Sequence, residues 1–197
     1  DTPSDFGLRS SAPTHPELLD WLAAEFVDGG WSVKKLHRLI MNSAAYRQST
    51  EQMPDLVLQA VKVDAANRLL WKFPRRRLDF EATRDSMLAV SGSLDRKLGG
   101  PASNVLKGFV PRRTVYGFVN RMDLPGLMRA FDFPEPAATS PGRETTTIAP
   151  QALYFLNNDF VTECARRLLT RKDVVELASH ELTADRIHKI YRILFSR

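Results

Sequence analysis

Apolar residues recur at helical spacing in two adjacent stretches near the beginning of the sequence. Thr14 and Glu17 form a capping-box pattern where the first stretch begins, and Gly29 and Gly30 mark its end. Ser32 then stands at the expected cap of a second helix. The two patterns together predict an αα-hairpin. Its inward-facing positions are Leu18, Leu19, Leu22 and Phe26 in the first helix and Val33, Leu36, Leu39 and Ile40 in the second.

The middle of the sequence contains shorter apolar patterns separated by turn residues. Asp64 is positioned to cap a helix that would bury Leu69 and Leu70. Residues 112–119 fit either a short strand or a helix, because their apolar pattern is too short to decide. The remaining elements are helices predicted over 65–73, 78–90 and 124–131, and a helix or irregular insert over 55–63.

The longest periodic stretch begins at Pro150 and continues for about five helical turns. Asp159 is a candidate cap that would divide it into two helices. A further helix is predicted over 184–195, and residues 132–147 form a long loop rich in proline. The sequence therefore predicts an all-α, or nearly all-α, irregular multi-helix bundle that starts with an αα-hairpin and has a long loop before the penultimate helices. The apolar stripe of the long stretch is Leu153, Leu156, Phe160, Cys164 and Leu168.

The length of 197 residues fits one helical domain over 1–197. We expect its core to come from 14–92 and 112–197, with 93–111 as a turn or mobile excursion because much of that segment is poor in apolar residues. The last helical pattern has no capping signal after it. We therefore expect the sequence to be a fragment of a longer multidomain chain.

Composition narrows the class of protein. With 43% hydrophobic and 26% charged residues, the chain is typical of a globular protein. No apolar run approaches the roughly 18 residues that a membrane helix needs, so no membrane span is expected. Cys164 is the only cysteine, which excludes an internal disulfide and leaves core packing as its expected role. The formal net charge is +5, but the basic residues are scattered over several predicted helices with acids between them, so no nucleic-acid partner is expected.

Most signatures of known chemistry are missing from the sequence. It has no Gly-rich phosphate loop, no nucleophile elbow and no paired Cys-x-x-Cys motif. Its four histidines do not stand at ligand spacing, so no metal site is expected. It also lacks the Cys-x-x-Cys-His motif that attaches c-type haem, and we expect no cofactor in this domain.

The densest run of charge contains Arg77, Glu81, Arg84 and Asp85, which share a face if the segment is helical. In one interpretation, Glu81 and Asp85 are the acid/base pair of a glycoside hydrolase. In the other, the four residues form an ion-pair ladder anchored by Arg77 and Arg84. Two carboxylates on one helix are poorly placed to flank a sugar bond, so the structural interpretation is favoured.

A second group of polar residues lies on either side of and within the loop over 132–147. These side chains either pin the loop or line a ligand pocket, in which Arg143 would hold an anion beside the N–H groups of the following helix. Thr147 is also expected to cap that helix, which favours pinning. The candidate ligand-binding residues are Arg113, Tyr116, Asp132, Arg143, Thr145 and Gln151.

Several short strings occur together in one order along the whole chain. Among them are Thr14-His15-Pro16-Glu17-Leu18-Leu19-Asp20-Trp21, Ser43-Ala44-Ala45-Tyr46-Arg47, Asn67-Arg68-Leu69-Leu70-Trp71, Arg112-Arg113-Thr114-Val115-Tyr116, Phe131-Asp132-Phe133-Pro134 and Ala149-Pro150-Gln151-Ala152-Leu153. In these the sequence resembles the C-terminal domain of unknown function, the fifteen fifty-three family, of large secreted planctomycete proteins. Many relatives have a proline where Ala65 stands here.

The resemblance implies an exported parent protein, in the periplasm, the cell envelope or outside the cell. It also implies an N-terminal cytochrome-c-like domain, so haem is expected elsewhere in the full-length protein. The family brings no established activity with it. We expect a non-catalytic helical module that binds other domains of the same chain or an envelope glycan. The alternatives are an enzyme domain acting on polysaccharide and a docking surface for the upstream cytochrome-like domain.

Overall fold

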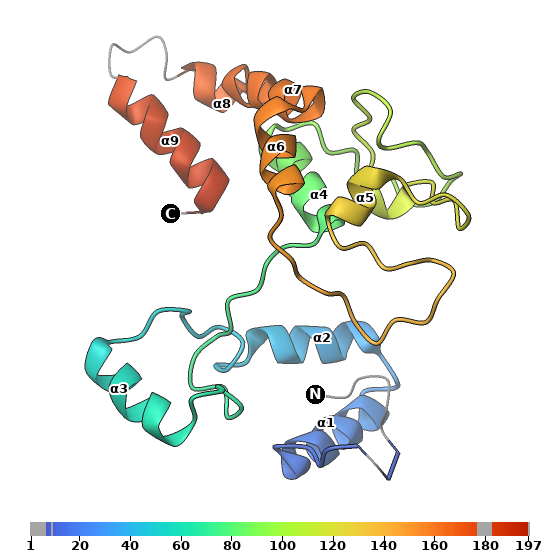
Figure 1. Cartoon of the computed structure of the whole chain (residues 1–197). Coiled ribbons are helices and arrows are strands. Elements are labelled where there is room, and N and C mark those ends of the chain that lie inside the picture. Colours follow the sequence, from blue (N-terminus) through green and yellow to red (C-terminus); the bar gives the residue numbers. More distant parts are fainter. Residues whose placement is uncertain (1–6, 9, 177–182, 197) are drawn as a thin grey trace. The chain divides into compact units, whose positions relative to one another are not determined.

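The computed structural model describes residues 7, 8, 10–176 and 183–196 (Figure 1). Regular structure within these ranges is helical, without a strand, and two isolated bridges join Asp95 to Arg112 and Ser103 to Gly117. The predicted all-α class is therefore confirmed. Contacts group the chain into two compact units, unit 1 over 1–76 and unit 2 over 77–197. The single domain proposed from the sequence stays a prediction.

Unit 1 begins with the expected αα-hairpin, made by α1 (Pro16–Asp28) and α2 (Val33–Asn42), which contact each other. The Ser32 hydroxyl caps α2 by accepting the backbone N–H of Lys35 at 3.3 Å. Gly30 makes the turn with a φ of +74°, a conformation that costs glycine little. The segment that was either a helix or an insert is a helix, α3 (Pro54–Val63).

Three local predictions in unit 1 were wrong. Five of the eight hairpin positions expected to face inward are exposed, namely Leu18, Leu19, Val33, Leu39 and Ile40. Thr14 does not cap α1; its hydroxyl lies 2.9 Å from Nδ1 of His15, the residue that precedes the helix. The helix expected over 65–73 is a series of turns, in which Leu69 and Leu70 are exposed. The Asp64 carboxylate binds the backbone N–H groups of Arg68 and Leu69, at 3.0 and 2.7 Å. Local bonds of this kind replace the bonds of a helix.

Unit 2 contains the elements that carry most of the polar contacts. Asp79 caps α4 by accepting the N–H of Ala82 at 2.8 Å. The segment that was either a strand or a helix holds the short 3-10 helix η1. The bounds in this unit are α4 (Phe80–Val90), η1 (Thr114–Tyr116), α5 (Gly126–Ala130), α6 (Ala149–Asn157), α7 (Asp159–Leu169), α8 (Lys172–Val175) and α9 (Thr183–Phe195). None of the helices within the described ranges is long and apolar enough to cross a membrane.

The stripe predicted after Pro150 is buried only in its second half. Asn158, not Asp159, caps α7 by accepting the N–H of Phe160 at 2.9 Å. The break rotates the two helices out of register, so that Leu153 and Leu156 are exposed. α6 instead buries two other side chains, Gln151 and Tyr154, while α7 buries Phe160, Cys164 and Leu168 as expected.

The core of unit 2 consists of two clusters of buried side chains. One contains Phe80, Leu124, Met128, Phe131 and Tyr154, and the other contains Leu88, Phe160 and Cys164. The segment 93–111, expected outside the core, also contributes to the interior. Its Val105 is buried, and Leu106 and Phe109 pack against the clusters.

Candidate functional site

The first turn of α4 is tied to the loop over 132–147. The two guanidinium nitrogens of Arg143 each donate to one oxygen of Glu81 at 2.6 Å, and Asp79 lies 3.8 Å away. The same guanidinium lies 5.0 Å from the ring centre of Phe133. Its hydrogen bonds to Glu81 raise the pKa of Arg143, so the cation is held more firmly. Both groups are partly exposed, and the pair fixes the loop to the helix.

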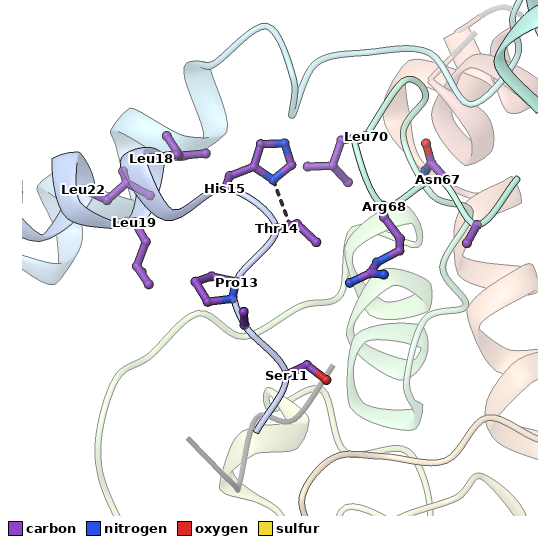
Figure 2. A pocket seen from close by; sticks show the side chains of 12 residues that line it. Ser11, Pro13, Thr14, His15, Leu18, Leu19, Leu22, Asn67, Arg68 and Leu70 are labelled. Atoms are coloured by element: carbon purple, nitrogen blue, oxygen red, sulfur yellow. Dashed lines mark hydrogen bonds between the residues drawn. The ribbon is translucent and has the colours of Figure 1, made fainter. Parts of the chain in front are cut away.

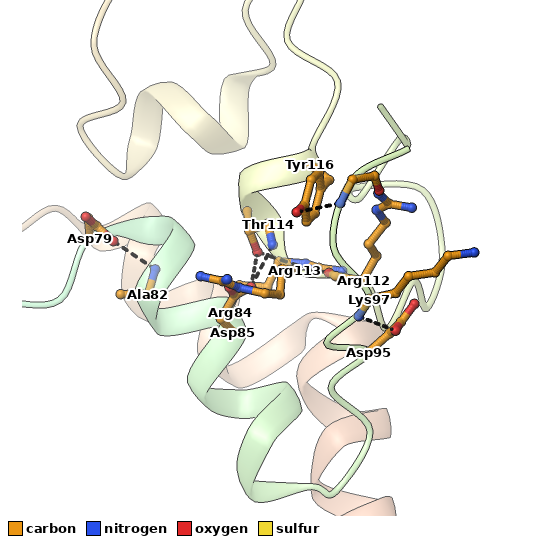
Figure 3. A network of polar contacts seen from close by, with 11 residues as sticks. Asp79, Ala82, Arg84, Asp85, Asp95, Lys97, Arg112, Arg113, Thr114 and Tyr116 are labelled. Carbon is orange, nitrogen blue, oxygen red and sulfur yellow. Dashed lines mark hydrogen bonds and ion pairs between the residues drawn. The ribbon is translucent and has the colours of Figure 1, made fainter. Parts of the chain in front are cut away.

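Asp85, one turn further along α4, holds the 3-10 helix η1. One of its carboxylate oxygens accepts both the backbone N–H of Thr114 at 2.7 Å and its hydroxyl at 2.6 Å. The other oxygen lies 3.6 Å from Nε of Arg113, a side chain that is 45% exposed. Figure 3 shows this network around Asp85 and Arg84.

Arg84 is a buried cation that carbonyl groups hold in place. Its guanidinium donates to the carbonyls of Val110 at 2.5 Å and Arg112 at 3.1 Å, and to the Thr114 hydroxyl at 3.2 Å. It also lies 4.5 Å from the ring centre of Phe160. Burial lowers the pKa of Arg84, because desolvation disfavours the charged form. Arg84 therefore joins α4, α7 and the segment before η1.

The predicted ion-pair ladder on α4 was wrong in its partners. Arg77 precedes the helix and cannot share a face with Glu81; it donates to the carbonyl of Thr146 at 2.5 Å and to Oγ1 of Thr147 at 3.0 Å. Thr147 consequently does not cap α6, which begins after Ile148 without a side-chain cap. The charged cluster therefore makes contacts across the sequence, where the spacing predicted contacts along one helix.

The other candidates from the sequence bind different partners. Asp132, at a φ of +56°, accepts the N–H of Thr146 at 2.8 Å and its hydroxyl at 2.7 Å. The Tyr116 hydroxyl accepts the N–H of Gly99 at 2.9 Å. Gln151 is buried and donates to the carbonyl of Ala130 at 2.7 Å, whereas Thr145 is exposed. Asp132, Tyr116 and Gln151 each tie their segment to another part of the chain.

Arg113 is the candidate that lines a hollow, of about 480 Å³, on one side of α4. Arg96, a second arginine on its wall, makes no ion pair with any residue that the structure describes. The turn that carries Arg96 is held by the N–H of Asp95, which donates to the carbonyl of Pro111 at 2.8 Å. The hollow is lined by Ala82, Asp85, Ser86, Ala89, Leu94, Arg96 and Arg113.

Sequence reasoning missed Arg96 and Ser86 as site residues. One signal was present: Ala82, Ser86 and Ala89 stand four and three residues apart, which places small side chains along one side of a helix. Small side chains leave room for a ligand beside the backbone. No pattern in the sequence indicated that Arg96 would lie against this face.

The geometry gives no cluster of ligands for a metal ion in the part of the chain that the structure describes. Cys164 is buried beside Leu88 and Phe160, and burial raises the pKa of its thiol while a hydrogen bond with Ser91 opposes the shift. A protonated thiol in apolar surroundings is a poor nucleophile. Its position agrees with the expected core packing.

Comparison with known proteins places the chain in a family. No curated protein and no solved structure matches it. The model of one family, described as PSD1, protein of unknown function (DUF1553), matches residues 1–197. The match spans both units, including the loop tied by Arg143 and the hollow beside α4. The chain therefore belongs to the DUF1553 (PSD1) family of proteins of unknown function.

Proposed function

We propose that the chain is a non-catalytic helical module of an exported multidomain protein, and that it binds an acidic glycan of the cell envelope. The hollow beside α4 would be the binding site. The observation that carries the proposal is that Arg96, which makes no ion pair with any described residue, lies next to the half-exposed Arg113 in one hollow. The export and the multidomain parent follow from the family resemblance.

The chemistry of the hollow suits a sugar acid. Its volume of about 480 Å³ lies within the range of roughly 300–1,000 Å³ that is usual for ligand sites. Arg113 touches its carboxylate partner through a single 3.6 Å contact, so the planar fork that binds carboxylates in pairs is largely unused. Ser86 adds a hydroxyl, and Asp85 adds an acceptor for sugar hydroxyl groups.

The contacts of the carboxylates support binding over catalysis. Glu81 uses both oxygens for Arg143, and Asp85 uses one oxygen for Thr114. A glycosidase needs two carboxyl groups that face each other across the scissile bond. Glu81 does not line the hollow, so Asp85 has no carboxyl partner there.

The test is calorimetric titration of the chain with trigalacturonic acid and with its fully methyl-esterified form. The acid is expected to bind, and Arg96→Gln or Arg113→Gln should each weaken it about tenfold or more, since a charge-assisted hydrogen bond is worth roughly 1.5–3 kcal/mol. Arg166→Gln is the matched control, because that arginine lies on α7 outside the hollow. Equal binding of the acid and the ester would contradict the proposal. If shorter oligosaccharides were found in the calorimeter cell after the titration, the alternative of an enzyme domain acting on polysaccharide would be supported instead.

A further inference from the structure

Unit 1 has a hollow of its own, of about 490 Å³, between the start of α1 and the turns over 65–70 (Figure 2). Four leucines line it, whereas a single leucine lines the hollow beside α4. Leu18, Leu19 and Leu70 are 49%, 56% and 43% exposed, and Leu22 also lines the hollow. A ligand that covered these side chains would remove apolar surface from water, which favours binding.

One cation stands at the rim of this hollow. Arg68 lines it and makes no ion pair with any residue in the described part of the chain. Its nearest acid in the sequence, Asp64, binds backbone N–H groups, including that of Arg68 itself at 3.0 Å. In Figure 2 the Arg68 side chain extends toward the segment that carries Pro13 and Thr14. The guanidinium is therefore placed to meet an anion at one side of an apolar wall.

His15 offers a second polar group at the same place. Its Nδ1 lies 2.9 Å from the Thr14 hydroxyl, which leaves Nε2 for another partner. Figure 2 shows the ring between α1 and Leu70. His15 and Arg68 thus border one space from two different segments of unit 1.

The backbone that presents Arg68 is held in a rare conformation. Asn67 and Leu70 have φ values of +54° and +57°, and a positive φ is unusual for a bulky residue such as leucine. Asn67 secures the turn by exchanging two side-chain bonds with the backbone of Lys72, at 2.8 and 3.2 Å. Such energetically unfavourable backbone conformations are kept only where neighbouring contacts enforce them, and they are found preferentially at binding sites.

We propose that this hollow binds a small aliphatic carboxylate, with the acyl chain against Leu18, Leu19 and Leu70 and the carboxylate on Arg68. The Arg68 guanidinium, which has no ion-pair partner among the described residues, matches one negative charge. The exposed leucine side chains that line the hollow match a hydrocarbon chain. The size of the hollow suits a medium-length acid. This ligand class is distinct from the acidic glycan, and the two sites share no residue.

The experiment titrates the full chain with octanoate and with octanamide, which has the same chain and no charge. The affinity for octanoate should be at least about tenfold higher than the affinity for octanamide, because the uncharged amide cannot make the charge-assisted hydrogen bond with Arg68. Arg68→Gln should abolish the difference between the two ligands, whereas Arg38→Gln, an exposed arginine of α2, should leave it unchanged.

Arg68→Lys keeps the charge and loses the paired donors, so it should retain part of the preference for octanoate. Tryptophan fluorescence checks that each variant keeps the parent fold of unit 1, because Trp21, Trp31 and Trp71 all lie there. Equal affinity for acid and amide, absence of binding by both, or an unchanged preference in Arg68→Gln would overturn the proposal. The proposed binding of trigalacturonic acid at Arg96 is tested separately, and none of these outcomes counts for or against it.

Discussion

Unit 1 and unit 2 carry helices with similar apolar patterns but bury them to different extents. Every buried residue that the structure describes belongs to unit 2. In unit 1, α1 leaves Leu18 and Leu19 about half exposed, whereas α7 of unit 2 buries the whole stripe of Phe160, Cys164 and Leu168. Helical periodicity therefore specifies a helix and its apolar face. Burial depends on what the rest of the unit packs against that face.

The two units also differ in what holds their irregular segments. In unit 1, side chains bind nearby backbone: Asp64 binds the turns that follow it, and Trp71 Nε1 donates back to the carbonyl of Asp64 at 2.9 Å. In unit 2 the ties span long stretches of sequence, as between Arg84 and Val110 or Arg143 and Glu81. Contacts between distant segments therefore couple more of unit 2 to its core.

The largest expected effect comes from Phe80→Ala. Phe80 is buried, with its ring 5.4 Å from that of Phe131 and 6.5 Å from that of Tyr154. The substitution should lower the free energy of unfolding of unit 2 by about 3–5 kcal/mol, because it leaves a cavity in the aromatic cluster. Urea unfolding monitored by hydrogen exchange in α4 and α7 measures the effect.

The matched change in unit 1 is Leu19→Ala, monitored by tryptophan fluorescence. Leu19 is more than half exposed, so the expected loss is about 0.5 kcal/mol or less. A loss of several kcal/mol at Leu19 would show that its face is covered in solution. Similar losses for the two substitutions would remove the contrast between the units.

Much of the helical architecture could be predicted because its signals are local. Ser32 caps α2 as its position indicated, and the apolar stripe of α7 is buried as its spacing indicated. The turns over 65–73 could not be predicted, since Asp64 as a helix cap and Asp64 as the centre of a turn have the same sequence signature. The choice between them depends on φ values that the sequence does not reveal.

The second expected effect comes from Arg84→Met. Methionine retains an apolar stem but removes the donor that satisfies the carbonyls of Val110 and Arg112. Leaving buried acceptors without a donor should lower the free energy of unfolding of unit 2 by about 2–4 kcal/mol. The same hydrogen-exchange experiment measures it, with Arg166→Gln on α7 as an exposed control. An unchanged stability in Arg84→Met would mean that water satisfies those carbonyls.

The candidate site was harder to predict than the fold because its contacts, like those of Arg84, join segments that are distant in the sequence. Glu81 and Asp85 were recognised as members of one charged cluster and Arg143 as a member of another, but Asp85 binds Thr114, 29 residues away, and Glu81 binds Arg143, 62 residues away. Sequence spacing identifies contacts along one helix, and it carries no information about which loop returns to that helix. Arg96 was missed because its place in the hollow depends entirely on such a return.

The third expected effect is a loss of stability in alkali. Burial raises the pKa of Tyr154 from 10.0 to about 12, so between these pH values the unfolded chain releases a proton that the folded chain retains. The free energy of unfolding of unit 2 should fall by about 2 kcal/mol as the pH rises through this window. Tyr154→Phe should remove this loss, while Tyr46→Phe in unit 1 should keep it. Equal alkaline profiles for the parent and Tyr154→Phe would contradict the burial of this ring.

The smallest expected effect concerns the link between α8 and α9. Asp173 contacts Arg171 at 3.0 Å and Lys189 at 3.7 Å, and the hydrogen bond from Arg171 lowers the pKa of Asp173 below its ordinary value of 3.8. The stabilisation by Asp173 is complete above its ordinary pKa of 3.8, and it is lost as the pH falls through the lower pKa that Asp173 has in the folded chain. Because the carboxylate is well exposed, the loss should be only about a few tenths of a kcal/mol.

Asp173→Asn should therefore lower the hydrogen-exchange protection factors in α9 at neutral pH and make these protection factors nearly independent of pH in acid. Asp123→Asn, at an exposed acid outside this link, should retain the acid dependence of the parent. Added salt should reduce the difference between Asp173→Asn and the parent, because exposed ion pairs are screened. A large loss of stability in Asp173→Asn that does not depend on salt would instead show that the α8–α9 link is buried in solution. In that case Ile187 and Tyr191, which are exposed on α9 here, would be covered in solution as well.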